Sequence, residues 1–206
     1  IPTVWKRVEE CPYVIGDFTW TSMDYLGEAG IGMTLYVPQT DPTYKLPQAE
    51  YPWRSGHCGD FDLCGDDRAQ LHLRKIVWGS DETYIFVHNP ANYDKKEIMS
   101  PWGFPDGADE WTWNGFEGAP ARVDVFSASP EVELFVNGIS CGRKKAGKEN
   151  GFIAAFDVKY EPGTIKAVSY DSSGNKVSEH ELVTSGKAVK LMIEFEKTEA
   201  RADGQS

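Results

Sequence analysis

The sequence predicts a mainly β protein, in which an immunoglobulin-like β-sandwich follows a unit made of one strand, a long loop and one helix. Two observations predict this. Short strand patterns separated by turn signals recur between residues 121 and 197, and a helical apolar pattern occurs at residues 66–78. Short strands with turns at such regular intervals are typical of an antiparallel sandwich of the immunoglobulin type.

The N-terminal segment, residues 1–79, begins with an apolar run at 14–20 that predicts a short buried strand. Three glycines between residues 26 and 32 then indicate turns and close approach of backbones. A long irregular loop is expected between residues 36 and 60, where four prolines occur: Pro38, Pro42, Pro47 and Pro52.

The helix expected at residues 66–78 completes this segment. Asp66 or Asp67 is positioned to cap its first turn, and Gly79 supplies the stop. A strand, a long loop and a helix in this order fit one βα unit of a barrel or of a doubly wound sheet.

Residues 80–120 are expected to form a linker and lead-in to the sandwich, with one strand candidate at 83–88. The segment is rich in proline and carries three tryptophans, Trp102, Trp111 and Trp113. We expect aromatic packing rather than regular structure to hold it.

The sandwich is predicted at residues 121–197. Strands are expected at 122–126, 132–136, 152–160, 164–170, 177–184 and 188–195. Asn137-Gly138 comes directly after one alternating strand pattern, and this dipeptide is the strongest short-range signal for a hairpin.

Charge and composition exclude several classes of function. The net charge of −11 argues against a nucleic-acid partner, which needs clustered lysine and arginine. No apolar run reaches the length of a membrane span. The sequence begins with Ile1 and has no signal-peptide pattern, so the compartment stays open, with a periplasmic or secreted parent as one alternative.

The four cysteines do not decide the compartment either. Cys11, Cys58, Cys64 and Cys141 lack the spacing of a zinc ribbon or a redox motif. Buried free thiols are the expected state, and a Cys58–Cys64 disulfide is the alternative.

Several stretches resemble the family 2 glycoside hydrolases, and in particular their β-galactosidase-like branch. They are residues 16–30 (GDFTWTSMDYLGEAG), 56–68 (GHCGDFDLCGDDR), 132–142 (VELFVNGISCG), 160–163 (YEPG), 165–170 (IKAVSY) and 202–204 (ADG). The resemblance implies that residues 1–79 are the last βα unit of a TIM barrel and that residues 121–197 are the sandwich that follows the barrel. It also implies that residues 198–206 open a further domain.

The resemblance also implies an activity. Family members cleave terminal β-linked sugars with retention, using two glutamates at the ends of barrel strands four and seven. Since residues 1–79 match strand eight and its surroundings, both glutamates would precede Ile1. We therefore expect this chain to be a C-terminal portion of such an enzyme that is inactive alone, contains no catalytic residue and requires no cofactor.

Four residues are candidates for binding the carbohydrate substrate in the parent enzyme. Trp20 matches the tryptophan that, in the family, forms a wall of the subsite for the non-reducing sugar. A flat apolar ring suits the C–H face of a sugar. Asp24, Tyr25 and Glu28 follow on the same loop, where they either bind sugar hydroxyls or brace the loop.

The acidic loop has two interpretations, a metal site and a solvated loop. Asp60, Asp62, Asp66 and Asp67 offer oxygen ligands of the kind that calcium prefers, but the EF-hand pattern is absent. A solvated acidic loop with helix caps is the favoured interpretation, and no metal is expected.

Two other hypotheses for the sandwich differ in class from the enzyme hypothesis. One is a carbohydrate-binding module with Trp102, Trp111 and Trp113 as an exposed platform, which burial of these side chains would exclude. The other is a structural module without a site of its own.

The sequence also predicts a homo-oligomer. The edges of the predicted strand eight would lack pairing partners, so we expect association through residues 1–40.

Overall fold

The computed structural model describes residues 1–28, 30–38, 55–194 and 199. Predictions that concern Pro42, Pro47, Pro52 and the domain opening at residues 202–204 lie outside the described residues. The helices are α1 (Pro2–Glu10), α2 (Ala69–Val77) and the short 3₁₀ turns η1 (Pro90–Asn92) and η2 (Lys148–Asn150). The strands are β1 (Thr34–Pro38), β2 (Thr83–His88), β3 (Lys95–Met99), β4 (Gly107–Ala108), β5 (Pro120–Ser127), β6 (Glu131–Val136), β7 (Ile139–Lys145), β8 (Ile153–Lys159), β9 (Thr164–Tyr170) and β10 (Lys176–Val183).

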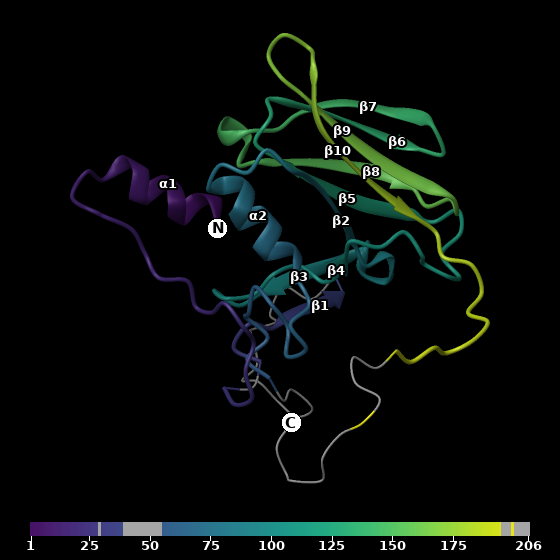
Figure 1. Cartoon of the computed structure of the whole chain (residues 1–206), viewed down its shortest axis with the longest axis horizontal. Coiled ribbons are helices and arrows are strands. Elements are labelled where there is room, and N and C mark those ends of the chain that lie inside the picture. Colours follow the sequence, from purple (N-terminus) through teal and green to yellow (C-terminus); the bar gives the residue numbers. More distant parts are fainter. Residues whose placement is uncertain (29, 39–54, 195–198, 200–206) are drawn as a thin grey trace.

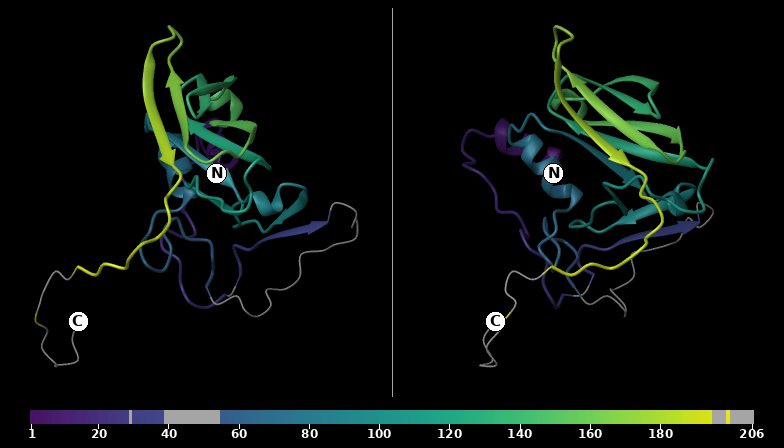
Figure 2. Two further views of the ribbon diagram at one scale, coloured as in Figure 1. Left: turned by 90° about the vertical axis from the view of Figure 1, so that its right-hand side faces the viewer. Right: turned by 45° about the vertical axis from the view of Figure 1, so that its right-hand side comes forward.

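The predicted sandwich is confirmed. Two four-stranded antiparallel sheets, in the orders β4-β2-β5-β8 and β10-β9-β6-β7, face each other (Figures 1 and 2). The chain passes between the sheets from β5 to β6 and again from β7 to β8 and from β8 to β9, as in immunoglobulin-like folds.

Alternation along the strands builds the core between the sheets. The fully buried side chains from the first sheet include Ile85, Val123 and Val125, and those from the second include Leu134 and Ile165.

The hairpin predicted after Val136 is also confirmed. Asn137 and Gly138 both have positive φ and join Val136 to its pairing partner Ile139.

Helix α2 covers the outer face of the first sheet. Its Leu73 and Ile76 pack against Tyr84, Phe86 and other rings that point away from the sandwich core. Strand β2 is therefore buried on both faces, which explains its continuous apolar sequence.

The cap predicted for this helix is wrong. The helix begins at Ala69 with Arg68 as the N-cap residue, and no side chain caps it. Asp67 lies instead within 3.5 Å of Lys75 and 3.6 Å of His72. The predicted stop is correct, because Gly79 has a φ of +104° directly after the last turn.

The sandwich also begins and ends earlier than the strand patterns predict. Strand β2 pairs with β5 along five residues, so it belongs to the sandwich and not to a linker. At the other end, β10 stops at Val183, and residues 188–194 form no strand although Val189 and Leu191 alternate with polar residues. Those two side chains are almost fully exposed, and no described strand pairs with them.

The strand predicted at residues 14–20 is wrong too. The structure has helix α1 before this segment and no regular element within it, and Ile15 and Phe18 are fully exposed. A strand of a parallel barrel needs hydrogen-bonding neighbours on both sides. No described strand pairs with residues 14–20, so the segment stays irregular. The barrel unit itself therefore remains a prediction.

The aromatic cluster of residues 102–113 is packed, as expected, but it forms no platform. Trp111 is fully buried in the sandwich core, where its ring meets Tyr160 edge to face and its Nε1–H donates to the Glu161 carbonyl at 3.0 Å. Trp113 is partly buried against the same core, and only Trp102 is about half exposed, at 48 %. The platform proposed for a carbohydrate-binding module is therefore contradicted.

Strand β10 seals the exposed edge of β2. The amides of Thr83 and Ile85 donate to Ser178 Oγ at 3.1 Å and to His180 Nδ1 at 3.0 Å. These side chains from the second sheet satisfy backbone groups at the edge of the first, and this blocks pairing with another chain at that edge.

The two α-helices of the described residues are both too short to span a membrane.

Candidate functional site

Two loops below α2 are joined backbone to backbone and carry the four predicted site residues. The amide of Asp24 donates to the Phe61 carbonyl at 2.9 Å, and that of Gly56 donates to the Tyr25 carbonyl at 2.8 Å. Further bonds run from Asp60 to Thr21, from Phe61 to Ser22, from Gly30 to Ser55 and from Gly32 to Gly56. The loops of residues 20–32 and 55–61 therefore form one unit, which we call the paired loops.

Glycine allows the two backbones to approach this closely. A Cβ atom at Gly32 would lie 2.2 Å from the carbonyl oxygen of His57, and one at Gly59 would lie 2.3 Å from the amide nitrogen of Asp24. Neither position leaves room for a side chain. Close backbone approach, predicted from the glycines of residues 26–32, is confirmed at Gly32.

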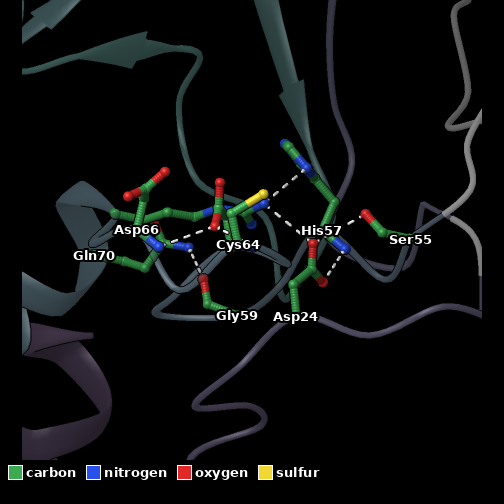
Figure 3. A network of polar contacts seen from close by, with 9 residues as sticks. Asp24, Ser55, His57, Gly59, Cys64, Asp66 and Gln70 are labelled. Carbon is green, nitrogen blue, oxygen red and sulfur yellow. Dashed lines mark hydrogen bonds and ion pairs between the residues drawn. The ribbon is translucent and has the colours of Figure 1, made fainter. Parts of the chain in front are cut away.

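Asp24 lies at the centre of this unit (Figure 3). Its Oδ2 accepts from Ser55 Oγ at 2.9 Å and from Arg68 Nη2 at 3.1 Å, and its Oδ1 accepts from the His57 amide at 2.6 Å. Burial opposes the charge, but the Ser55 hydrogen bond, the Arg68 charge and the His57 amide together lower the pKa of Asp24. Asp24 is therefore an ionised brace with both oxygens occupied.

Side chains of α2 hold the second loop in place. Arg74 makes a two-point contact with the buried Asp60, with Nε at 2.8 Å from Oδ2 and Nη2 at 3.2 Å from Oδ1. Gln70 Nε2 donates to the Gly59 carbonyl at 2.6 Å. The helix on the sandwich thus positions the loop that in turn positions Asp24.

The other three predicted residues lie on the surface of the same unit and contact one another. Trp20 Nε1–H donates to the Tyr25 hydroxyl at 3.1 Å, and the Tyr25 hydroxyl donates to Glu28 Oε2. The two rings meet edge to face, and Trp20 is 59 % exposed. The hydrogen bond to Glu28 raises the pKa of Tyr25. This series of contacts fixes the edge of the indole and leaves its flat surface accessible.

A groove of about 530 Å³ lies beside Trp20. Cys58, Arg74, Trp78 and Trp102 are among the residues that line it. An exposed indole next to a groove can stack on a flat apolar surface such as a sugar ring, and Glu28 can accept hydrogen bonds from hydroxyls.

Two carboxylates of the acidic loop have partners in the protein, one on helix α2 and one within the loop. Asp60 pairs with Arg74, and Asp62 Oδ1 accepts from the amides of Cys64 and Asp66 at 2.7 and 3.0 Å. Within the described part of the chain, no group of acidic, histidine and cysteine residues has the arrangement of a metal site.

The cysteines differ from the expectation in part. All four are free, so the alternative of a Cys58–Cys64 disulfide is wrong. Only Cys58 is buried, and burial raises the pKa of its thiol, whereas Cys64 and Cys141 are exposed.

Sequence reasoning missed the residues that support the loop. Ser55, His57 and Arg68 contact Asp24 across 31 to 44 positions of the chain. No local pattern marks such pairs. The only available signal was the glycine content of both loops, which indicated close packing without naming a partner.

The chain is similar in sequence to known proteins. Residues 118–178 match the family model described as a domain of unknown function, DUF4982. The chain is 29 % identical over 200 residues to the beta-galactosidase BoGH2A of Bacteroides ovatus, which covers 97 % of this chain and 19 % of that protein. It is 26 % identical to a putative beta-glucuronidase of Formosa agariphila, over 95 % of this chain and 16 % of that protein.

A solved structure extends the similarity to three dimensions. A glycosyl hydrolase family 2 member from Bacteroides cellulosilyticus superposes with a TM-score of 0.75 at 38 % identity, over 90 % of this chain and 24 % of that one. The chain thus spans about a fifth of the curated relatives that it matches and about a quarter of this structure.

Proposed function

The chain belongs to glycoside hydrolase family 2, and from this premise we propose that it is the C-terminal portion of a retaining β-glycosidase that hydrolyses terminal β-linked sugars. One observation carries the proposal. The residues that resemble the end of the catalytic barrel fold into the paired loops, which present an exposed, edge-anchored Trp20 beside a groove.

In the proposed enzyme, Trp20 stacks on the C–H face of the terminal sugar. Tyr25 holds the indole edge, and Glu28 accepts hydrogen bonds from sugar hydroxyls. Asp24 supports the loop that carries these residues and does not contact the substrate itself. Because its carboxylate is buried and paired with Arg68, it sets the position of the loop and does not meet the sugar.

The catalytic carboxylates lie elsewhere in the proposed parent. A retaining mechanism needs two carboxyl groups about 5 Å apart on either side of the glycosidic bond. Asp24 and Asp60, the buried carboxylates of the paired loops, each form an ion pair with an arginine. We therefore propose that this chain alone is inactive.

Hydrolysis of nitrophenyl β-galactoside, β-glucuronide and β-mannoside tests the proposal. The chain alone should release no nitrophenol, whereas a longer polypeptide that includes this chain and a complete barrel should hydrolyse one of the three. Turnover by the chain alone would contradict the assignment of the catalytic pair, and an inactive longer polypeptide would contradict the enzyme proposal.

Replacing Trp20 by alanine in the longer enzyme should lower kcat/KM by roughly 10- to 100-fold, because a stacking surface for the sugar is lost. Trp20→Phe keeps a flat ring and should recover most of the activity. Ile139→Ala, an exposed change on the sandwich, serves as the control and should leave kcat/KM unchanged. Equal rates for Trp20→Ala and the control would exclude a substrate contact.

A structural role is the second candidate for the sandwich itself. Its inward-facing residues form a continuous core, and its β2 edge is sealed by β10. A module that supports the barrel needs no more than these features and the contact between α2 and the first sheet.

We further propose that the isolated chain self-associates through residues 1–40. Ile15 and Phe18 are fully exposed in this segment, and exposed apolar residues favour association. Sedimentation velocity should show a dimer or larger species that Ile15→Ser with Phe18→Ser converts to a monomer. A wild-type chain that stays monomeric at high concentration would contradict this proposal.

A further inference from the structure

A second pocket, which shares only Arg122 with the groove beside Trp20, lies where the β1–β3 ribbon meets the sandwich. β1 and β3 pair antiparallel from Thr34 opposite Met99 to Pro38 opposite Lys95, and Figure 1 shows this ribbon at the lower end of the sandwich. The pocket has a volume of about 310 Å³. It is lined by residues of the ribbon, β2, η1, β5 and β8, together with Asn89, Tyr93 and Asp106, and we call it the ribbon pocket. Its volume is at the lower end of the range for small-molecule sites.

Two tyrosine rings in this pocket are fixed at their hydroxyl ends. Tyr36 Oη donates to Glu97 Oε2 at 2.9 Å and accepts from the Asp106 amide at 2.8 Å. Tyr93 Oη donates to Asp157 Oδ1 at 3.2 Å. Tyr93 is 43 % exposed, so its ring is both anchored and accessible.

Three carboxylates of the pocket retain acceptor capacity. The hydrogen bonds of the described residues engage Oε2 of Glu97, Oδ2 of Asp106 and Oδ1 of Asp157, and leave the second oxygen of each. None of the three forms an ion pair with a described residue. Carboxylates held by neutral donors are strong acceptors for ligand hydroxyls.

The amide groups beside these carboxylates are also held in position. Asn89 and Asn92 donate to the same Asp106 oxygen at 2.9 and 3.0 Å, and Lys95 Nζ donates to Asn92 Oδ1 at 3.0 Å. The Asn89 side chain also accepts from the Ala91 amide, which fixes the turn η1. The polar groups of the wall are therefore ordered before any ligand binds, which lowers the entropy cost of binding.

Charge in the pocket selects among ligand classes. Arg122 and His88 lie against Asp124, and Lys95 Nζ is held by Asn92 Oδ1, so these three basic residues of the wall form no ion pair with Glu97, Asp106 or Asp157. An anionic ligand would be repelled, and an apolar ligand would leave the carboxylates without hydrogen bonds. Anchored aromatic rings together with ordered acceptors suit a neutral polyol.

We propose that the ribbon pocket is a second carbohydrate site, which holds one neutral pyranose unit apart from the site at Trp20. The choice of carbohydrate as ligand class rests in part on the proposed function. In the full enzyme, such a site would retain a polysaccharide or a branched oligosaccharide near the barrel without taking part in the reaction.

The test is a nuclear magnetic resonance titration of this chain with the methyl β-glycosides of galactose, glucose, xylose and glucuronic acid. At least one neutral glycoside should bind with a Kd in the millimolar range and shift the amide signals of Ala91, Asn92 and Tyr93. The glucuronide should bind at least tenfold more weakly.

Variants assign the binding to the pocket. Tyr93→Ala should weaken the neutral glycoside roughly tenfold, and Asp157→Asn should weaken it while the rest of the spectrum stays unchanged. Trp20→Ala is the matched control and should leave the binding as it is.

Three results would overturn the proposal: no saturable shift with any neutral glycoside, binding at the ribbon pocket that survives Tyr93→Ala and Asp157→Asn, or shifts confined to the Trp20 loop. The function proposed for Trp20 is tested separately, by hydrolysis with the longer enzyme. Either proposal can therefore fail while the other stands.

Discussion

Replacing Trp111 by alanine is expected to lower the free energy of unfolding by about 3–5 kcal/mol, the largest stability change among the substitutions considered for this chain. The ring is fully buried, meets Tyr160 with centroids 4.9 Å apart, and donates to the Glu161 carbonyl. Its removal leaves a cavity in the sandwich core and an unpaired carbonyl. Since a domain is stable by only about 5–15 kcal/mol, this loss would remove a large part of the total.

Urea unfolding followed by far-ultraviolet circular dichroism measures this effect without relying on tryptophan fluorescence. Trp111→Phe should cost less, because it keeps most of the packed volume and loses mainly the hydrogen bond. Trp102→Ala, at a half-exposed position, should cost about 1 kcal/mol or less. If Trp111→Ala were as mild as Trp102→Ala, the buried position of Trp111 would be wrong and an exposed aromatic platform would regain support.

Replacing Asp24 by asparagine should destabilise the paired loops by roughly 3 kcal/mol at neutral pH. The change removes the charge that compensates Arg68 and one of the acceptors used by Ser55 and the His57 amide. The estimate is at the lower end for buried ion pairs, because the Arg68 side chain remains 21 % exposed. Hydrogen exchange at the amides of Gly56 and Asp60, which bridge the loops, reports this change.

The effect should depend on pH with a defined sign. Because the folded protein lowers the pKa of Asp24, the unfolded chain binds its proton more readily. The stabilisation is fully present above the ordinary aspartate pKa of about 3.9 and is lost as the pH falls through the lower folded value. The difference between wild type and Asp24→Asn should therefore shrink in acid.

The matched control for this substitution is Asp94→Asn, an exposed carboxylate outside the paired loops. It should change neither the exchange rates nor their pH dependence. Protection of Gly56 and Asp60 that is equal in wild type and Asp24→Asn at neutral pH would show that Asp24 does not brace the loops.

For the candidate site, local sequence identified the surface but not its support. Trp20, Asp24, Tyr25 and Glu28 lie within nine residues of each other, and the structure joins three of them by hydrogen bonds on one surface. The fourth, Asp24, points into the paired loops instead. Its position depends on Arg68, which is 44 positions away in the chain, so only the fold could show that Asp24 is buried while Trp20 is exposed.

The sequence by itself determined strands β5, β6, β8, β9 and β10, the Asn137-Gly138 hairpin and helix α2, because each depends on a periodicity or a turn preference that acts within a few residues. The tertiary structure alone decided which of the apolar runs became strands. Residues 83–88 gained hydrogen-bonding partners on both sides and joined the sandwich, whereas residues 14–20 and 188–194 did not and remained irregular. A strand exists only where a neighbour satisfies its backbone groups, and no pattern inside the strand specifies that neighbour.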